Sequence, residues 1–190
     1  MITLKSPQEI EKMRKAGKVV GNTLEALRKA AKAGMTTLEL DELARDLISQ
    51  EGAIASFKGY HGYPAHACIS VNDQVIHGIP SNRVLLEGDI VSIDLGAIVE
   101  GYHGDSAITF PIGEISEAAK NLLAVTEESL KAGIEAAIVG NHLGDISHAI
   151  ESVVNRYRFG IVREFVGHGI GNSMHEEHQI HNYGPWLLKT

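Results

Sequence analysis

The spacing of apolar residues changes twice along this chain, and this change restricts the fold more than any other feature of the sequence. Helical spacing covers residues 6–52 in two segments. The first begins at Ser6-Pro7, with Pro at a position that a helix start tolerates. The second begins at Thr36, which together with Glu39 has the form of a capping box. Short alternating segments follow, and helical spacing returns over 116–137 and 143–158. This order predicts an α/β (α+β) domain.

The order helix, helix, strand occurs twice, and some residues repeat with it. Four small residues at 26, 30, 31 and 34 recur at an offset of 106, and the Gly-x-His-Gly segment around His61 resembles the one around His168. Because small residues are common, chance explains part of this match. We predict one domain over 1–190, with a first pseudo-repeat at 1–112 and an incomplete second one at 113–190.

Charge and composition exclude several classes of protein. The chain has 17 Lys and Arg against 24 Asp and Glu, so we expect no nucleic-acid partner. No apolar run approaches the ~18 residues of a membrane span, and residues 1–7 carry no apolar export signal. Cys68 is the only cysteine, which excludes an intrachain disulfide and fits a reducing compartment. We therefore expect a cytoplasmic protein without membrane attachment.

Two hairpins are predicted in the middle of the chain. The first joins 67–71 to 74–79 through Asn72-Asp73, and the second joins 90–99 to 103–110 through residues 100–102. A further strand is predicted at 161–165, before a glycine-rich turn.

Asp94 and Asp105 lie on the two strands of the second hairpin. A turn centred between Val99 and Glu100 would place them directly opposite, and a centre one residue later would make them diagonal neighbours. Facing carboxylates destabilise a hairpin, and a divalent cation between them would offset that cost. The alternative is that one of them is a turn or surface residue and the two never meet.

Histidine is frequent, with ten residues, and three histidines are the better candidates for a site. His168 lies between glycines that let a ligand approach the backbone, His77 precedes Gly78 at a predicted strand end, and His175 opens a His-Glu-Glu-His segment. That segment is not the zinc motif H-E-x-x-H. Structural roles are expected for four of the others: His66, His142, His148 and His181.

Cys68 lies within a predicted strand and has no signature of a catalytic nucleophile around it. We therefore expect Cys68 to be either a small buried apolar residue or a residue that lines a pocket.

Six segments together make the chain resemble the type I methionine aminopeptidases, from about Ser6 through Tyr183. They are Gly59–Pro64, Val75–Pro80, Asp89–Asp94, Gly101–Asp105, Gly167–Gly171 and Met174–Glu177. The resemblance implies the pita-bread fold, in which two pseudo-symmetric halves surround a metal site. It also implies a hydrolase, a metalloprotease that excises N-terminal methionine by means of metal-activated water.

The resemblance implies a role for each matching residue. Asp94, Asp105 and His168 would be metal ligands, His175 would donate to the peptide carbonyl, and His77 would contact the substrate beyond the scissile bond. The methionine side chain would be bound by Phe57, Tyr60, His61, Tyr63, Cys68 and Met174. The cofactor would be one or two divalent ions of Co, Mn, Fe or Zn, and the partners would be peptides or nascent proteins that begin with Met.

The sequence departs from this family pattern after Tyr183, where the family supplies two more ligating glutamates and residues 184–190 contain none. Missing strands would expose a sheet edge and favour self-association. A second hypothesis is therefore a truncated, weakly active or inactive relative that keeps the fold to bind protein or the ribosome. A third, a proline-specific member of the pita-bread group, is disfavoured by the Tyr60–Pro64 motif.

Overall fold

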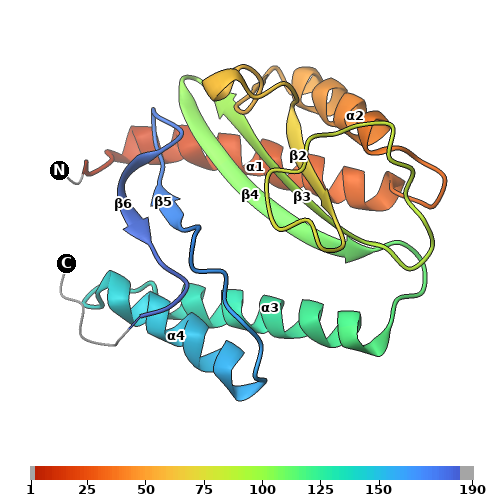
Figure 1. Cartoon of the computed structure of the whole chain (residues 1–190). Coiled ribbons are helices and arrows are strands. Elements are labelled where there is room, and N and C mark those ends of the chain that lie inside the picture. The colour runs from red at the N-terminus through yellow and green to blue at the C-terminus, as the bar shows by residue number, and fades with distance from the viewer. Residues whose placement is uncertain (1–2, 185–190) are drawn as a thin grey trace. The chain divides into compact units, whose positions relative to one another are not determined.

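The computed structural model describes residues 3–184, which form two compact units (Figure 1). The sheet unit contains residues 3–116 and 170–175, and the helical unit contains residues 117–169 and 176–184. The expected division into pseudo-repeats at 1–112 and 113–190 stays a prediction.

Two helices begin the sheet unit, and both begin where the sequence predicts. Helix α1 spans Pro7–Ala30 after the N-cap Ser6, and α2 spans Thr37–Gln50 after the N-cap Thr36. Each cap side chain accepts a hydrogen bond from the backbone N–H of the glutamate three residues on, whose carboxylate accepts from the cap in return. These capping boxes pair N–H groups that the first turn of a helix leaves without partners.

The sheet of this unit has four antiparallel strands: β1 (Ile54–Ala55), β2 (Ala67–Val71), β3 (Ile90–Val99) and β4 (Tyr102–Pro111). Strands β1 and β2 pair with successive parts of β3, and β4 pairs with β3 along its whole length. A short 3₁₀ turn, Tyr60–Gly62, separates β1 from β2. Strand β3 is therefore the central strand.

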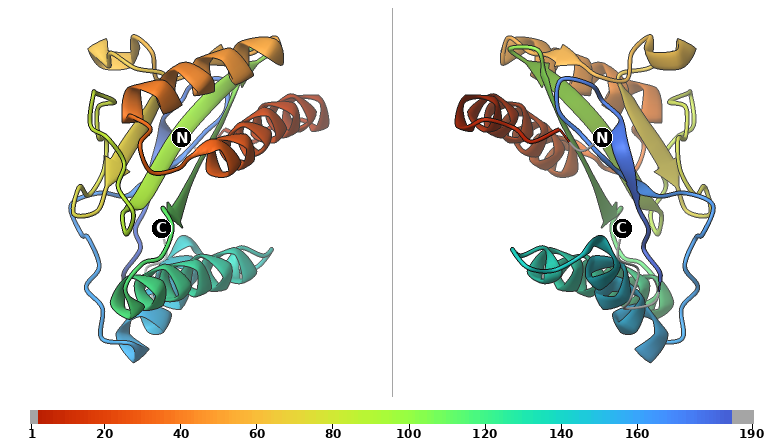
Figure 2. Two further views of the ribbon diagram at one scale, coloured as in Figure 1. Left: turned by 90° about the vertical axis from the view of Figure 1, so that its right-hand side faces the viewer. Right: turned by 90° about the vertical axis from the view of Figure 1, so that its left-hand side faces the viewer.

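Helices α1 and α2 pack on one face of this sheet (Figures 1 and 2). Alternate residues of β3 point to that face and are fully buried, as are their counterparts on β2 and on the helices. The largest of these core side chains are Leu27, Leu40, Ile48, Ile69, Leu85, Ile93, Leu95 and Ile112. The remaining residues of β3, Asp94 among them, point to the opposite face.

The predicted second hairpin is confirmed, with a two-residue loop. Val99 pairs with Tyr102, and Glu100 and Gly101 both have positive φ, at 50° and 80°. Positive φ at both loop positions is the requirement of a type I′ turn, whose twist matches that of the strands. Tyr102, expected in the loop, begins β4.

The predicted first hairpin is wrong in its second half, because residues 74–79 form no strand. A backbone hydrogen bond from the Ile69 N–H to the Gly78 carbonyl oxygen links the segment to β2, and side chains satisfy neighbouring backbone groups. The Gln74 side chain accepts from the Val71 N–H, and the Ser70 hydroxyl accepts from the Gly78 N–H. Strand β2 takes its partner from β3, so the apolar residues of 74–79 stay exposed.

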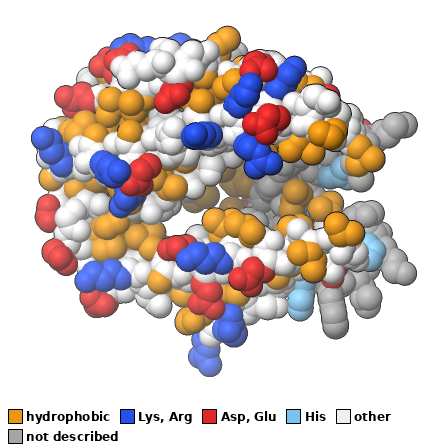
Figure 3. Space-filling model, turned by 180° about the vertical axis from the view of Figure 1, so that it is seen from behind, with side chains coloured by type: hydrophobic (Ala, Val, Ile, Leu, Met, Phe, Trp, Pro, Cys, Tyr) orange, Lys and Arg blue, Asp and Glu red, His pale blue; other side chains and the backbone are white. Residues whose placement is uncertain are grey.

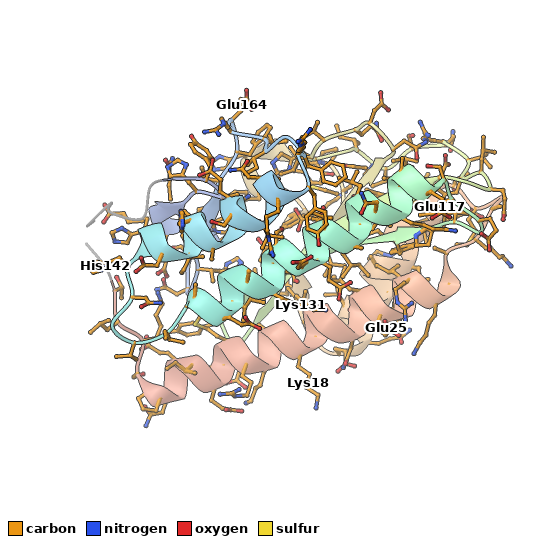
Figure 4. All side chains as sticks on the ribbon, turned by 90° about the horizontal axis from the view of Figure 1, so that it is seen from below. Lys18, Glu25, Glu117, Lys131, His142 and Glu164 are labelled. Carbon is orange, nitrogen blue, oxygen red and sulfur yellow. The ribbon has the colours of Figure 1, made fainter. Side chains whose placement is uncertain are left out.

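The helical unit contains α3 (Glu117–Ala136), α4 (Leu143–Arg156) and a ribbon of β5 (Gly167–Gly169) with β6 (Glu176–Ile180). Helices α3 and α4 lie side by side, and Figure 4 marks Glu117 and Lys131 along α3 and His142 at the start of α4. They approach closely at Gly133, where an added Cβ would lie 2.9 Å from Ile150.

The strand predicted at 161–165 is wrong. The Arg163 guanidinium donates a hydrogen bond to the Glu151 carboxylate and lies over the Tyr183 ring. The side chains of Val162 and Phe165 are exposed. These side-chain contacts replace strand pairing, and the pairing begins at β5.

Across residues 3–184, no helix has both the length and the apolar character that crossing a membrane requires. On the face shown in Figure 3, positive and negative side chains are interspersed with apolar ones.

Candidate metal centre

Asp94 and Asp105 point to the same face of the sheet, opposite the helices. Strand pairing sets Asp94 against Ala107 and Asp105 against Gly96, and directly paired residues share a face. The two aspartates are therefore diagonal neighbours, as expected for a turn centred one residue after the Val99–Glu100 bond. The alternative in which they never meet is wrong.

The two carboxyl groups interact strongly. Burial, the charge of Asp105 and a hydrogen bond between the two groups together raise the pKa of Asp94 to about 8, and burial has the largest effect. This raised pKa favours a proton on Asp94 near neutral pH, because a buried charge beside a second carboxylate is disfavoured. A divalent cation would replace this proton, and oxygen ligands suit hard and borderline cations. The residues present fit a metal ion.

Cys68 and His77 lie beside Asp94. Cys68 pairs directly with Asp94 across β2 and β3, and its Sγ lies 3.6 Å from Nδ1 of His77. One ligand atom from each of the three residues falls within 4.8 Å of the other two. Burial raises the pKa of the Cys68 thiol to about 11, so the thiol is not an activated nucleophile.

An apolar cluster lies around the cysteine. Phe57, Cys68 and Met174 are buried together, and Tyr60 and Tyr63 pack against them. The rings of Phe57 and Tyr63 meet edge to face at 6.4 Å. The His61 ring lies 4.3 Å from that of Tyr60. The structure therefore brings all six residues expected to contact the methionine side chain into one neighbourhood.

Tyr60 also holds His175. The Tyr60 hydroxyl lies 2.8 Å from Nδ1 of His175, and the two rings stack with centroids 5.3 Å apart. Met174 and His175 belong to the segment 170–175, which is part of the sheet unit and is anchored by the hydrogen bond from His103 N–H to Gly171 O. The imidazole orientation is thus fixed by a cluster residue.

His168 lies in the helical unit, on β5. Its Nδ1 is 2.9 Å from the carbonyl oxygen of Gly169, and a carbonyl can only accept, so Nδ1 carries the proton. The lone pair is then on Nε2, the tautomer that a metal ligand requires. That His168 binds the same metal ion as Asp94 and Asp105 is part of the proposal below.

Further contacts that the sequence did not predict support this site, through the expected residue Tyr63 and through Ser56 and His103, which were not expected to take part. The Tyr63 hydroxyl lies 3.1 Å from both the Ala67 and the Gly78 carbonyl oxygens, which ties the start of β2 to the segment that carries His77. The Ser56 hydroxyl contacts Nδ1 of His103. Nothing in the local sequence pattern marks these contacts, because their partners are set by the tertiary fold.

Gly104 allows close packing beside Asp105. A Cβ added there would lie 2.6 Å from the Gly17 backbone nitrogen and 2.7 Å from the Ala16 carbonyl carbon. Helix α1 therefore approaches β4 at a distance that only glycine permits.

Comparison with known proteins assigns the chain and its fold to a class. The family model "Metallopeptidase family M24" matches residues 11–189, which extends beyond Tyr183, where we placed the end of the resemblance. The chain belongs to metallopeptidase family M24 and has its pita-bread fold. Members of a metallopeptidase family use a metal ion.

The similar proteins of known name are methionine aminopeptidases. The chain is 58% identical over 185 residues to the "Methionine aminopeptidase" of Clostridium acetobutylicum, covering 97% of this chain and 74% of that protein. It is 52% identical to "Methionine aminopeptidase 1" of Bacillus subtilis, covering 97% and 75%. The crystal structure of methionine aminopeptidase from Thermotoga maritima superposes with a TM-score of 0.98 at 42% identity, over 100% of this chain and 77% of that one.

Proposed function

We propose that this chain removes the N-terminal methionine from peptides and nascent proteins by metal-dependent hydrolysis. One observation carries the proposal: Cys68 belongs to the apolar cluster and pairs directly with Asp94 of the carboxylate pair. A surface suited to a thioether is therefore adjacent to a surface suited to a divalent cation. The relatives described above support the same activity.

Asp94, Asp105 and His168 are the proposed metal ligands. The ion would be Co, Mn, Fe or Zn, as one or two ions. When bound, it would activate water and polarise the scissile carbonyl. The raised pKa of Asp94 supports this assignment, because a cation would offset the repulsion that now keeps a proton on the pair.

The apolar cluster is the proposed contact surface for the methionine side chain. Phe57, Tyr63 and Met174 offer apolar and aromatic atoms, and sulfur packs well against such groups. Because Cys68 is 3% exposed, it supplies shape to this surface rather than reactivity.

His175 and His77 are the proposed catalytic histidines. If the Tyr60 hydroxyl donates to Nδ1 of His175, the proton of that imidazole resides on Nε2. His175 can then donate a hydrogen bond to the carbonyl oxygen as negative charge develops on it. His77 would contact the part of the peptide beyond the scissile bond.

Cleavage of Met-Ala and Met-Gly peptides by the purified chain tests the proposal, with Co, Mn, Fe or Zn supplied one at a time. We expect release of methionine, loss of activity with a strong chelator, and loss of activity in Asp105→Ala. The matched control is Asp73→Ala, in the exposed turn after β2, which should keep full activity.

Absence of cleavage with every metal, together with no metal uptake, would support the second hypothesis instead, a relative that keeps the fold for binding. The paired carboxylates argue against that hypothesis, because a pure binding scaffold has no use for the destabilising pair.

A cytoplasmic location, binding to the ribosome and self-association are parts of the proposal that rest on the sequence. Co-sedimentation with ribosomes would test the second, and size-exclusion chromatography with light scattering would test the third. We expected two ligating glutamates to be missing after Tyr183. That expectation concerns residues 184–190, of which 185–190 lie outside the residues that the structure describes.

A further inference from the structure

We propose that Cys68, His77 and Asp94 form a second cation site, selective for a soft or borderline divalent ion such as Zn²⁺. The ligand atoms of these residues already lie within 4.8 Å of one another. A thiolate, an imidazole and a carboxylate form a donor set that zinc accepts in tetrahedral geometry.

The geometry agrees with one ion shared by the sulfur and the nitrogen. Bonds of ~2.3 Å to sulfur and ~2.0 Å to nitrogen at a tetrahedral angle span ~3.5 Å between these two atoms. The observed distance from Cys68 Sγ to His77 Nδ1 is 3.6 Å. The pair is therefore spaced for coordination without movement of either backbone.

The third ligand is held by strand pairing. Cys68 and Asp94 are directly paired residues on adjacent strands, so their side chains leave the same face of the sheet side by side. Binding would replace the thiol proton with the ion and release that proton to water. The fourth position would be filled by water.

The surroundings favour entry of an ion from one side. Cys68 is buried and Asp94 is half-buried, whereas His77 is exposed and lies on the irregular segment after β2, with φ at 57°. An ion from solvent would meet the imidazole first and the thiol last.

The site would share Asp94 with the proposed catalytic metal and Cys68 with the apolar cluster. If the proposed function holds, an ion here would occupy the surface that receives the methionine side chain. Zinc in excess would then act as an inhibitor rather than as an activator.

Cadmium offers a direct test, because the chain has one cysteine and a thiolate bound to Cd²⁺ gives an ultraviolet charge-transfer band. We expect the metal-free chain to develop this band with one equivalent of Cd²⁺ and to lose it when Zn²⁺ is added. Since loss of even an outer partner of a metal ligand weakens binding by ~10–100-fold, His77→Ala and Asp94→Asn should each weaken Cd²⁺ binding more than about tenfold. The matched control is His148→Ala, an exposed histidine on α4.

Two results would overturn the proposal: no band in the wild-type chain, or an unchanged affinity in both variants, which would mean that the thiol binds cadmium alone. The ¹¹³Cd resonance of the wild-type chain gives a second measurement that needs no variant. It should show sulfur and nitrogen donors together, and a shift typical of oxygen donors alone would contradict the site. Neither measurement uses a peptide substrate, so the cation site and the peptidase activity can fail separately.

Discussion

Replacing Asp94 by asparagine should stabilise the metal-free chain at neutral and alkaline pH. The amide has the shape of the protonated carboxyl group and can donate to Asp105 in the same way, but it cannot ionise. The substitution therefore removes the charge repulsion and keeps the hydrogen bond.

The size of the effect follows from the pKa of Asp94. The folded chain raises it from 3.8 to about 8, mainly through burial and then through Asp105. A difference of about 4 in pKa corresponds to ~5 kcal/mol, a large share of the ~5–15 kcal/mol that typically stabilises a domain.

The sign is set by proton binding. The folded chain binds this proton more tightly than the unfolded chain, so the contribution of Asp94 to stability is fully present below about pH 4 and is lost as the pH rises through about 8. Wild type and Asp94→Asn should therefore have similar free energies of unfolding near pH 4. Near pH 8 the variant should be more stable by several kcal/mol.

Urea unfolding followed by circular dichroism at a series of pH values measures this difference. Asp73→Asn, in an exposed turn, is the control and should follow wild type at every pH. Mn²⁺ should stabilise wild type near pH 8 and leave Asp94→Asn unchanged. A difference between variant and wild type that does not depend on pH would refute the argument.

Three other substitutions test separate parts of the structure. Gly104→Ala should lower the free energy of unfolding by ~1–3 kcal/mol in urea titrations, because its Cβ would meet the α1 backbone at 2.6 Å. Asp41→Ala should cost ~2–4 kcal/mol by thermal unfolding, since the buried carboxylate accepts from the backbone N–H groups of His66 and Ala67 and from the His66 ring. Tyr60→Phe should lower kcat about tenfold with little change in KM, because His175 loses the hydroxyl that orients it, and equal changes in both constants would count against that role.

The sequence predicts well those elements whose structure depends on residues only a few positions away in the chain. The caps at Ser6 and Thr36 act within three residues, and the β3–β4 turn depends on Gly101 and the residue before it. The diagonal placement of the aspartates was one of two registers that the sequence allowed. Only the two-residue loop decides between them, and a glutamate at φ 50° is not a residue that turn propensity would select.

The misplaced strands show what local patterns lack. Residues 74–79 and 161–165 are rich in the β-branched residues typical of strands. Side chains of Gln74, Ser70 and Arg163 nevertheless make contacts there that a strand partner would otherwise make. Strand β6, which the sequence did not predict, is mostly polar and forms because β5 offers it a partner. Pairing between segments distant in sequence cannot be derived from the periodicity of either one.

The two parts of the candidate site also differ in how far apart their residues lie along the chain. Asp94 and Asp105 sit on strands joined by a two-residue turn, whereas Tyr60 and His175 are 115 positions apart. Contacts between residues close in sequence require little loss of chain entropy and form early in folding, whereas contacts between residues distant in sequence form later. During synthesis, the two aspartates would therefore be in place well before Tyr60 and His175 could meet.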